Sequence, residues 1–438
     1  MRALTVALLC LTMLFTFAGG LLAEGTVQSD LIWISSLTSL KQVTTYLPEG
    51  YDPSDTETLY PTVFFLHGGY TTPASYPMLI DVLDDIIWTG DGEPPEGYIH
   101  PVICVMPDGN FGDYGGMTWW NNSEVNGAYS DYVWNDLVTW ADDTYNTCAD
   151  PSKRAIMGHS MGGYGALSNA LRHTDVFRAV GTHGGVIDFT TTINGITPWV
   201  LDENGGSGPY SPAAGVWSEV LFSMAAAFSP NLDNQPDPVD LPIDNNGDID
   251  PDIWPEWVND DPPHLALDHT AATQPAMYIQ VGEDDELWDE VAAAFVDSVL
   301  AQGLECRFDI HPGDHNNALA DRFPYTLAFF DSVFYNITSA PEHGLQRTLP
   351  DQFELHPAHP NPFNATTRCV LDLPQPAHVE LALYDTLGRQ VRRVHDGFLA
   401  PGRHTFAVSG RNIAGGLYFL HAEVDGVSGL TQKLVLLK

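Results

Sequence analysis

The sequence is poor in basic residues, with 17 Lys and Arg against 57 Asp and Glu in 438 residues, a formal net charge of −40. Such a balance repels the phosphates of nucleic acids, so the composition argues against a nucleic-acid-binding protein. Because 44% of the residues are hydrophobic, the chain can still bury a sizeable core. At about 100–200 residues per domain, the length predicts two or three domains.

Cysteine is also scarce. The chain has five cysteines, and no two of them stand in a Cys-x-x-Cys pair. The spacing therefore lacks the pattern of a cysteine zinc site or a thiol redox site. The cysteines predict neither a metal site nor a redox centre.

Long hydrophobic runs are missing after the N-terminus, so no internal membrane-spanning helix is predicted. At the N-terminus, Arg2 precedes a largely apolar run over residues 3–18, and Ala23 offers a small residue at a cleavage point. We therefore expect residues 1–23 to be a signal peptide and the protein to be exported. An uncleaved anchor is the alternative, which the shortness of the run disfavours.

Between residues 31 and 335, short apolar runs alternate with helical patterns, such as those over 130–146 and 287–301. This alternation predicts a mostly parallel sheet flanked by helices, the α/β class, preceded by an antiparallel hairpin over 31–47. The predicted parallel strands are Thr62–His67, Pro101–Pro107, Arg154–His159, Ala179–His183, Ala276–Val281 and Cys306–His311.

Residues 188–262 interrupt this rhythm with a stretch rich in Gly, Pro, Asn and Asp that contains one amphipathic helix, from Trp217 to Phe228. An insertion of this size between two strands predicts a cap over a site. Its acidic segment Asp244–Asp250 suggests a calcium loop, but Pro242 takes the place of the first ligand, so a plain acidic turn is preferred.

Beyond residue 340 the composition changes. A Pro-rich stretch predicts a linker over 341–355, which ends the first domain, residues 24–340. Residues 356–438 show only strand patterns separated by glycine turns, which predicts a small antiparallel β-sandwich. The predicted strands are Val379–Tyr384, His404–Val408, Gly416–Val424 and Leu430–Leu437.

The strongest motif is Gly158-His159-Ser160-Met161-Gly162, at the junction of a predicted strand and a predicted helix over 161–172. A tight turn there lifts the serine oxygen above the sheet, and glycines let the backbones pass. The helix N-terminus offers N–H groups to a developing negative charge. The motif predicts Ser160 to be a nucleophile.

A serine nucleophile needs a base to take its proton and a carboxylate to orient that base. Asp285 follows the fifth predicted parallel strand and His315 follows the sixth, which is the order Ser, Asp, His. We predict His315 as the base and Asp285 as the acid. Asp284 is the neighbouring alternative for the acid, and His311 is the rival base, although it falls within or at the end of a strand.

The Gly-rich turn His67-Gly68-Gly69-Tyr70 directly follows the first predicted parallel strand. Backbone N–H groups in such a turn can bind an oxyanion, and we expect Gly69 rather than Tyr70 to do so, together with Met161. Trp119, Trp120 and Tyr70 are predicted to line the substrate cleft, where aromatic rings suit sugars or aromatic acyl groups. For the tryptophans, a role in packing is the alternative.

Four blocks together resemble a known family: LHGGY (66–70), RAIMGHSMGGYGAL (154–167), VGEDDEL (281–287) and HPGDH (311–315). They are similar to the secreted putative-esterase family of α/β-hydrolases, which includes esterase D, feruloyl and acetyl-xylan esterases and mycolyltransferases. The resemblance implies an α/β-hydrolase catalytic domain that needs no metal or other cofactor. It puts Asp285 and His315 at the acid and base positions. It does not extend to the cap, so it names no substrate.

A second resemblance covers the C-terminal domain. The blocks HPNPFN (359–364), YDTLGR (384–389), GGLYF (415–419) and KLVLLK (433–438) are similar to those of type IX secretion sorting domains. The resemblance implies the type IX secretion machinery as a partner and a secreted or cell-surface location. A carbohydrate-binding module is the alternative for a β-sandwich in this place.

Together these patterns predict a secreted serine carboxylic-ester hydrolase that acts on a small-molecule or polysaccharide ester. Carbohydrate-linked acetyl or feruloyl esters are the expected substrates. An acyltransferase that moves the acyl group to a sugar hydroxyl is one alternative. A non-catalytic surface glycan-binding protein is another, which the presence of Ser, Asp and His together argues against.

Overall fold

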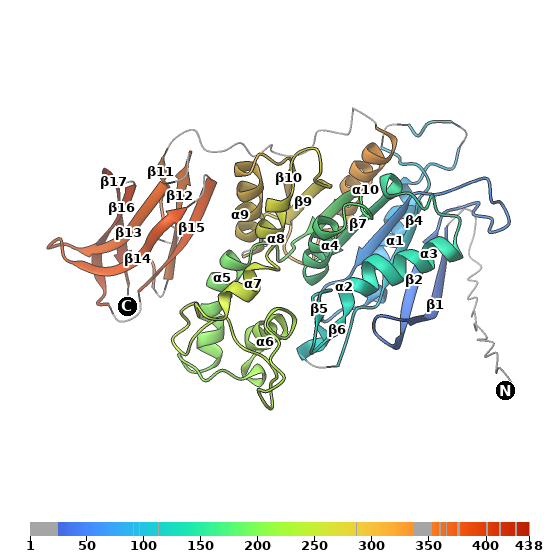
Figure 1. The fold of residues 1–438 in the computed structure, drawn as a ribbon. Coiled ribbons are helices and arrows are strands. Elements are labelled where there is room, and N and C mark those ends of the chain that lie inside the picture. Colours follow the sequence, from blue (N-terminus) through green and yellow to red (C-terminus); the bar gives the residue numbers. More distant parts are fainter. Residues whose placement is uncertain are drawn as a thin grey trace.

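The computed structural model describes residues 25–336 and 353–437, apart from 91, 96, 113 and 286 in the first range and 359, 360, 365, 375, 376, 400, 401, 411, 412, 425 and 426 in the second. The predicted signal peptide (1–23) and residues 341–352 of the predicted linker lie outside the described residues. The described chain has two parts, an α/β domain and a smaller all-β region (Figure 1).

An eight-stranded sheet forms the centre of the α/β domain. Six of its strands run parallel, and an antiparallel hairpin continues the sheet at one edge. This confirms the predicted fold class, and the hairpin starts five residues earlier than expected. In their order across the sheet the strands are β1 (Thr26–Ile34), β2 (Ser39–Leu47), β4 (Ile103–Pro107), β3 (Thr62–Leu66), β7 (Arg154–His159), β8 (Ala179–His183), β9 (Ala276–Gly282) and β10 (Arg307–His311).

Helices cover both faces of this sheet, so its parallel strands read as continuous apolar runs. In β3, Val63 and Phe65 face a layer formed by α1 (Pro77–Ile86) and α10 (Leu319–Tyr335). Phe64 and Leu66 point the other way, because successive side chains of a strand alternate. The opposite layer contains α2 (Tyr129–Asp131), α3 (Val138–Thr144), α4 (Met161–Arg172) and α9 (Trp288–Ala301).

The helix expected over 130–146 is present, but it is not regular. The segment Tyr132–Leu137 is a π-helix between α2 and α3. In a π-helix each hydrogen bond spans one more residue than in an α-helix. An apolar pattern that departs from a 3.6-residue period can therefore still face the core. Tyr132, Val133 and Leu137 are all buried there.

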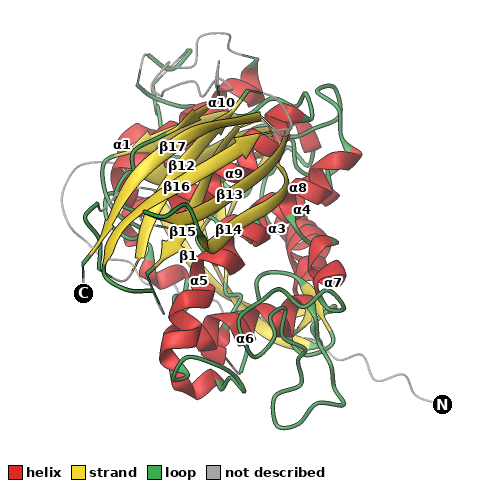
Figure 2. Cartoon of the chain, turned by 90° about the vertical axis from the view of Figure 1, so that its left-hand side faces the viewer, coloured by secondary structure: helices red, strands yellow, loops and turns green. Residues whose placement is uncertain are grey.

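The insertion over 188–262 contains three α-helices, which lie in the lower part of the molecule in both views (Figures 1 and 2). They are α5 (Phe189–Glu203), α6 (Val216–Phe228) and α7 (Trp254–Val258), and α8 (Pro262–Leu265) begins at the last residue of the insertion. Sequence analysis missed α5, because Gly195 and Pro198 are poor helix formers. The Asp188 side chain caps this helix by accepting the Thr191 N–H. The stretch 244–250 is an acidic turn, in which the Asp244 carboxylate accepts the N–H groups of Asn246 and Asp248.

The C-terminal region consists of two antiparallel sheets that share one apolar core, as the predicted sandwich requires. Their strands are β11 (Glu354–Leu355), β12 (Thr366–Leu373), β13 (Ala377–Asp385), β14 (Gln390–Leu399), β15 (Gly402–Ser409), β16 (Gly416–Val424) and β17 (Val427–Leu436). Sequence analysis missed β12 and β14, since charged residues such as Arg392 and Arg393 break the apolar alternation. Figure 1 places β15 on the side of α9.

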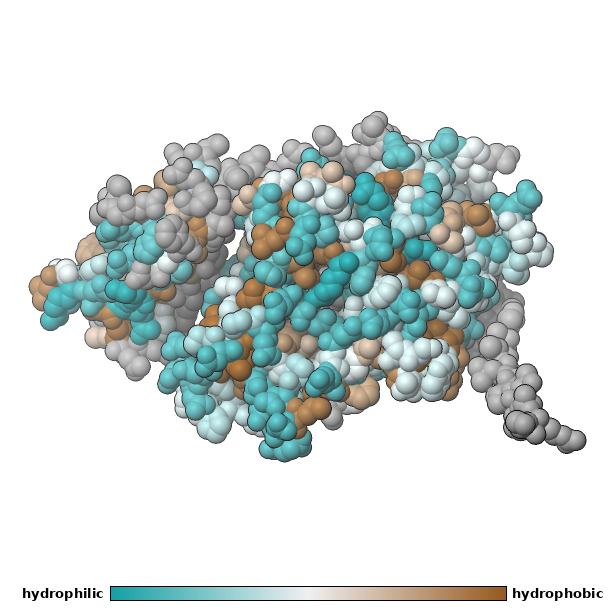
Figure 3. Space-filling view, in the orientation of Figure 1, coloured by the Kyte–Doolittle hydropathy of each residue, from teal (hydrophilic) through white to brown (hydrophobic). Residues whose placement is uncertain are grey.

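The surface reflects the acidic composition. The face drawn in Figure 3 is largely hydrophilic, with small hydrophobic patches scattered over it. Within the described residues, no helix is both long enough and apolar enough to cross a membrane. Cys104, Cys148, Cys306 and Cys369 are free thiols, and the first and last of these are buried.

An ion pair joins the start of β7 to α3, and its loss is expected to destabilise the domain. Arg154 Nη2 donates to Asp142 Oδ2 at 2.7 Å, and the Arg154 side chain is buried. Asp142→Asn leaves this cation without its counter-charge, so we expect the free energy of unfolding to fall by about 2 kcal/mol. Urea unfolding measures the change. Asp143→Asn, on the exposed face next to it, is the control and should have an effect within about 0.5 kcal/mol.

Candidate active site

Ser160 occupies a strained turn between β7 and α4. Its backbone has φ 56° and ψ −118°, a conformation that residues other than glycine rarely adopt. Two glycines make the turn sterically feasible. A Cβ on Gly158 would lie 2.1 Å from the Gly162 carbonyl oxygen, and one on Gly162 would lie 1.9 Å from the Leu66 oxygen. The Ser160 N–H donates to the His183 carbonyl at 2.9 Å, which ties the turn to the end of β8.

Asp285 and His315 form a hydrogen-bonded pair at the ends of β9 and β10. The Nδ1 atom of His315 lies 3.0 Å from both carboxylate oxygens of Asp285. The Asp285 side chain is only 2% exposed and the His315 side chain 23%. Because Nδ1–H donates to the carboxylate, Nε2 is the nitrogen left to accept a proton.

Two contacts bring Ser160 beside this pair. The ring of its neighbour His159 lies 4.8 Å from the His315 ring, and His159 Nε2 lies 2.8 Å from the His315 carbonyl oxygen. Gly184 follows the carbonyl that binds the Ser160 N–H. A Cβ on this glycine would lie 2.9 Å from the Asp285 carboxylate and 3.0 Å from His315 Nδ1. Ser160 therefore lies at the same end of the sheet as the Asp285–His315 pair.

The two alternative partners lie elsewhere. Asp284 is exposed, and its N–H donates to the Gly313 carbonyl. His311 is the last residue of β10, and its ring stacks on Tyr325. The geometry thus favours Asp285 over Asp284 and His315 over His311.

His159 joins the loop of His315 to the turn after β3. Its Nε2–H donates to the His315 carbonyl, and its Nδ1 accepts from the Tyr76 hydroxyl at 2.9 Å. The same hydroxyl accepts the Gly68 N–H at 3.0 Å. Burial, with the nearby His315, lowers the pKa of His159 to about 3, so its ring is neutral as this bonding requires. We name this set the His159–Tyr76–Gly68 chain.

Sequence analysis missed the positions that build this chain. His159 is one of the two variable residues of the Gly158–Gly162 motif. Tyr76 lies between the short 3₁₀ helix Pro73–Ser75 and the start of α1. Arg322 was also missed. It is buried behind the His315 loop, and its Nη2 donates to the carbonyls of Asp314 and Asn317 at 3.0 and 2.9 Å. These side chains hold the loop from two sides.

The expected oxyanion donors lie on adjacent turns. Since Tyr76 takes the Gly68 N–H, the next N–H along the turn is that of Gly69, the predicted donor. His67 braces the turn: its Nδ1 lies 2.8 Å from the Gly68 oxygen, and its Nε2 accepts the Gly109 N–H. Met161 is the first residue of α4, where an N–H has no partner within the helix.

Trp119 and Trp120 do not line a cleft, contrary to the prediction. Their exposed fractions are 2% and 0%. Trp119 Nε1 donates to Ser223 of α6, whereas Trp120 Nε1 donates to the His67 carbonyl. The cap covers Trp119, whose ring also lies against Phe228 of α6. Trp120 is instead enclosed by His67, Gly109 and Gly165, so it packs the turn His67–Tyr70, which we name the oxyanion turn, against α4. Tyr70 differs, because it is 52% exposed and its hydroxyl donates to Glu219 of α6.

The site contains no cluster of metal ligands. Within the residues that the structure describes, no group of three or more His, Cys, Asp or Glu side chains could hold a metal ion. The arrangement offers instead a hydroxyl on a strained turn, an imidazole held by a carboxylate, and backbone N–H groups nearby. This set can support nucleophilic attack on a carbonyl carbon.

Tyr76→Phe should lower kcat by about 10-fold with little change in KM. The variant removes the acceptor of the Gly68 N–H and the donor to His159, so the oxyanion turn and the His315 loop lose their link. Hydrolysis of an aryl acetate measures the effect. Tyr132→Phe is the control, since that buried hydroxyl has no hydrogen-bond partner among the described residues. Equal kcat values for the two variants would contradict a positioning role.

His159 also makes stability depend on pH. In the folded protein its pKa is about 3, whereas an unfolded imidazole takes up a proton below about pH 6.5. Unfolding therefore binds an extra proton between pH 3 and 6.5, and this contribution to stability is lost as the pH falls through that window. We expect a slope of up to about 1.4 kcal/mol per pH unit from this group.

Urea unfolding at pH 4.5, 5.5 and 7.5 measures this dependence. His159→Asn should unfold at lower urea at pH 7.5 and should show a shallower loss of stability toward pH 4.5. An unchanged slope would show that His159 is not neutral and buried in the folded state.

Comparison with known proteins identifies the family of the chain. Residues 35–316 match the family described as Putative esterase. Esterase Rv1288 of Mycobacterium tuberculosis (strain ATCC 25618 / H37Rv) is 27% identical over 192 residues, which are 41% of this chain and 38% of that protein. An endo-1,4-beta-xylanase/feruloyl esterase of Xylanibacter ruminicola is 27% identical over 164 residues, 35% of this chain and 21% of that protein.

The chain thus spans well under two thirds of the length of these curated relatives. Among solved structures, a ferulic acid esterase superposes with a TM-score of 0.50 and 19% identity, covering 71% of this chain and 99% of the other. At that identity, the likeness shows a shared fold. Because the family match covers more than half of the chain and includes Ser160, Asp285 and His315, the protein belongs to the Putative esterase family.

Proposed function

We propose that the protein is a serine esterase that hydrolyses carboxylic esters through an acyl-enzyme. The observation that carries this proposal is the Asp285–His315 pair held beside Ser160 on its strained turn. Membership of an esterase family supports the same reaction class. The proposed reaction needs no further nucleophile, base or acid beyond Ser160, His315 and Asp285.

In the first step, Ser160 Oγ attacks the ester carbonyl carbon while His315 Nε2 takes the hydroxyl proton. The carbonyl oxygen becomes an oxyanion, which the N–H groups of Gly69 and Met161 stabilise. When the tetrahedral intermediate collapses, the carbon–oxygen bond to the alcohol breaks. His315 gives its proton to the leaving alcohol, and the acyl group stays on Ser160.

In the second step, His315 takes a proton from a water molecule that attacks the acyl-enzyme. Collapse of the second intermediate releases the carboxylic acid and returns the proton to Ser160. Asp285 accepts the Nδ1–H bond throughout, so it keeps Nε2 directed to the reacting atoms and stabilises the imidazolium form. Helix α4 begins at the site, and its positive end also favours the oxyanion.

We further propose carbohydrate-linked acetyl or feruloyl esters as substrates. Support comes from a curated relative named as a xylanase/feruloyl esterase and from a fold neighbour titled a ferulic acid esterase. We also propose that the protein is exported and reaches the cell surface or the medium through type IX secretion. Support for this comes from the sequence over 1–23 and from the C-terminal blocks.

Ser160→Ala should lower kcat by at least about 10³-fold and leave the fold intact, because it removes the nucleophile without adding volume. His315→Ala should do nearly the same. The assay is hydrolysis of aryl acetate, butyrate and ferulate esters, with circular dichroism as the check on folding. Full activity of a folded Ser160→Ala variant would contradict the mechanism. An acyl-sugar product formed on adding an acceptor sugar would indicate transfer in place of hydrolysis.

Asp285→Asn should lower kcat by about 10³-fold, because the amide can no longer hold His315 in the required tautomer. Asp284→Asn is the matched control. It changes an exposed carboxylate one residue away, and we expect less than about a 3-fold effect. The same aryl acetate assay compares the two. The reverse order of effects would assign the acid to Asp284.

A further inference from the structure

We propose that a groove beside the oxyanion turn is a subsite for a neutral sugar ring of the substrate. This inference rests on the proposed esterase function and extends it. The groove has a volume of about 430 Å³. It lies between the loops that follow β3 and β4, and its lining residues are Tyr70, Thr71, Thr72, Asn110, Phe111, Gly112, Gly115 and Gly116.

The position of the groove relates it to the reacting ester. Tyr70 directly follows Gly69, the expected oxyanion donor. In the sheet the order is β4, β3, β7, and Ser160 follows β7. Because adjacent strands lie about 4.8 Å apart, the loop after β4 is about 10 Å from the nucleophile. A ligand in the groove would extend past the oxyanion turn, on the side away from Asp285 and His315.

The lining chemistry fits an uncharged, polar ligand. None of the described lining residues is charged, so the lining itself offers a phosphate or carboxylate no ion-pairing partner. The nearby cation Lys41 is already engaged, since its Nζ donates to the Asn110 carbonyl and lies over the Tyr129 ring. Two carboxylates stand at the cap side, where Glu219 accepts from Tyr70 and Asp237 accepts from Tyr114. Their charge disfavours an anionic ligand further. Only Tyr70 and Phe111 offer sizeable apolar surface, which is too little for a long acyl chain.

A sugar ring combines the two features that this groove can bind. Tyr70 and Phe111 are 52% and 47% exposed, and aromatic rings of this kind pack against the C–H faces of sugars. The glycines at 112, 115 and 116 have φ values of 24°, 66° and 73°. Glycine suits such a backbone, and the missing side chains leave peptide groups bare for hydrogen bonds to hydroxyls.

The groove is also pre-formed. Asn110 Nδ2 donates to the Thr71 carbonyl at 2.8 Å, which ties the two loops together. The Tyr70 ring rests against Gly115, where a Cβ would lie 2.4 Å from Cε1, and the Tyr70 hydroxyl is held by Glu219 at 2.7 Å. Since these contacts exist without a ligand, binding requires little ordering of the loops.

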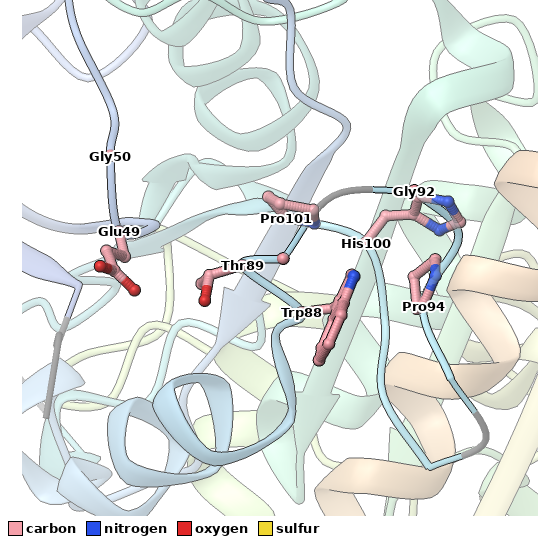
Figure 4. Close-up of a pocket in the computed structure, with 9 residues that line it drawn as sticks. Glu49, Gly50, Trp88, Thr89, Gly92, Pro94, His100 and Pro101 are labelled. Atoms are coloured by element: carbon pink, nitrogen blue, oxygen red, sulfur yellow. The ribbon is translucent and has the colours of Figure 1, made fainter.

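Another cavity does not compete for this role. It has a volume of about 240 Å³ and is lined by residues such as Glu49, Trp88 and His100 (Figure 4). His100 shortly precedes β4, so this cavity lies at the amino ends of the parallel strands. Ser160 is at their carboxyl ends. A substrate whose ester lies at Ser160 would not reach it.

The test compares the same acetyl group on three alcohols, two oligosaccharides and 4-nitrophenol. We would measure kcat/KM for acetylated xylotriose, acetylated cellotriose and 4-nitrophenyl acetate with the full chain. Phe111→Ala should lower the ratio of the better oligosaccharide value to the aryl value by about 10-fold, mainly through KM, because only the oligosaccharide reaches the groove. Tyr98→Ala is the matched control and should leave the ratio unchanged. Tyr98 is an exposed aromatic residue shortly before β4, at the amino ends of the parallel strands and away from Ser160.

Different results would overturn the sugar subsite and the proposed esterase function. Serine-dependent hydrolysis of the aryl ester with an unchanged ratio in Phe111→Ala would overturn the subsite and leave the esterase intact. Absence of serine-dependent hydrolysis on all three esters would overturn the proposed function itself. Calorimetry on Ser160→Ala gives a second readout: xylotriose or cellotriose should bind, and adding Phe111→Ala should weaken that binding by a similar factor.

Discussion

The site depends on how closely the start of α4 approaches the ends of β3 and β7. Side chains at Gly158 and Gly162 would overlap the neighbouring backbone, so the approach is possible only with glycine at both positions. It sets Ser160 at a positive φ and brings the N-terminus of α4 to the turn that contains Gly69. The proposed nucleophile and the two proposed oxyanion donors therefore take their positions from one backbone contact, and the ends of β9 and β10 supply the proposed partners, Asp285 and His315.

A second constraint is electrostatic. The chain carries a formal charge of −40, yet His159 and His183 beside the site are neutral because burial lowers their pKa values. Neutral His159 can both donate and accept, which is what the His159–Tyr76–Gly68 chain requires. The buried cation Arg322 lies behind the His315 loop and faces the charge of Asp285. The positive charge near the triad is thus local and fixed, in a molecule that is otherwise strongly acidic.

Much of the fold, and the positions of the candidate site residues at the strand ends, could be predicted from the sequence. The parallel strands are apolar runs, and Ser160, Asp285 and His315 follow three of them, so the topology alone brings them to one edge. The roles of Tyr76 and Arg322 could not be predicted, since they arise from contacts between distant segments. The burial of Trp119 and Trp120 could not be predicted either, because Trp119 packs on a later insertion and Trp120 packs on the turn after β3 and on α4. Helix α5 was missed because packing outweighs the poor propensity of its glycine and proline.

The contacts of Trp119 and Trp120 bear on how the specificity of this protein can change. Trp119 binds α6 in the cap, and Trp120 binds the carbonyl of the residue that braces the oxyanion turn. The cap is therefore part of the core and not a detachable lid. A chimera that exchanges residues 188–262 for the cap of another esterase would uncover the Trp119 indole, which packs on Phe228 and donates to Ser223. Such an exchange must bring its own complementary surface, so specificity is more easily altered at the open groove than by replacing the cap.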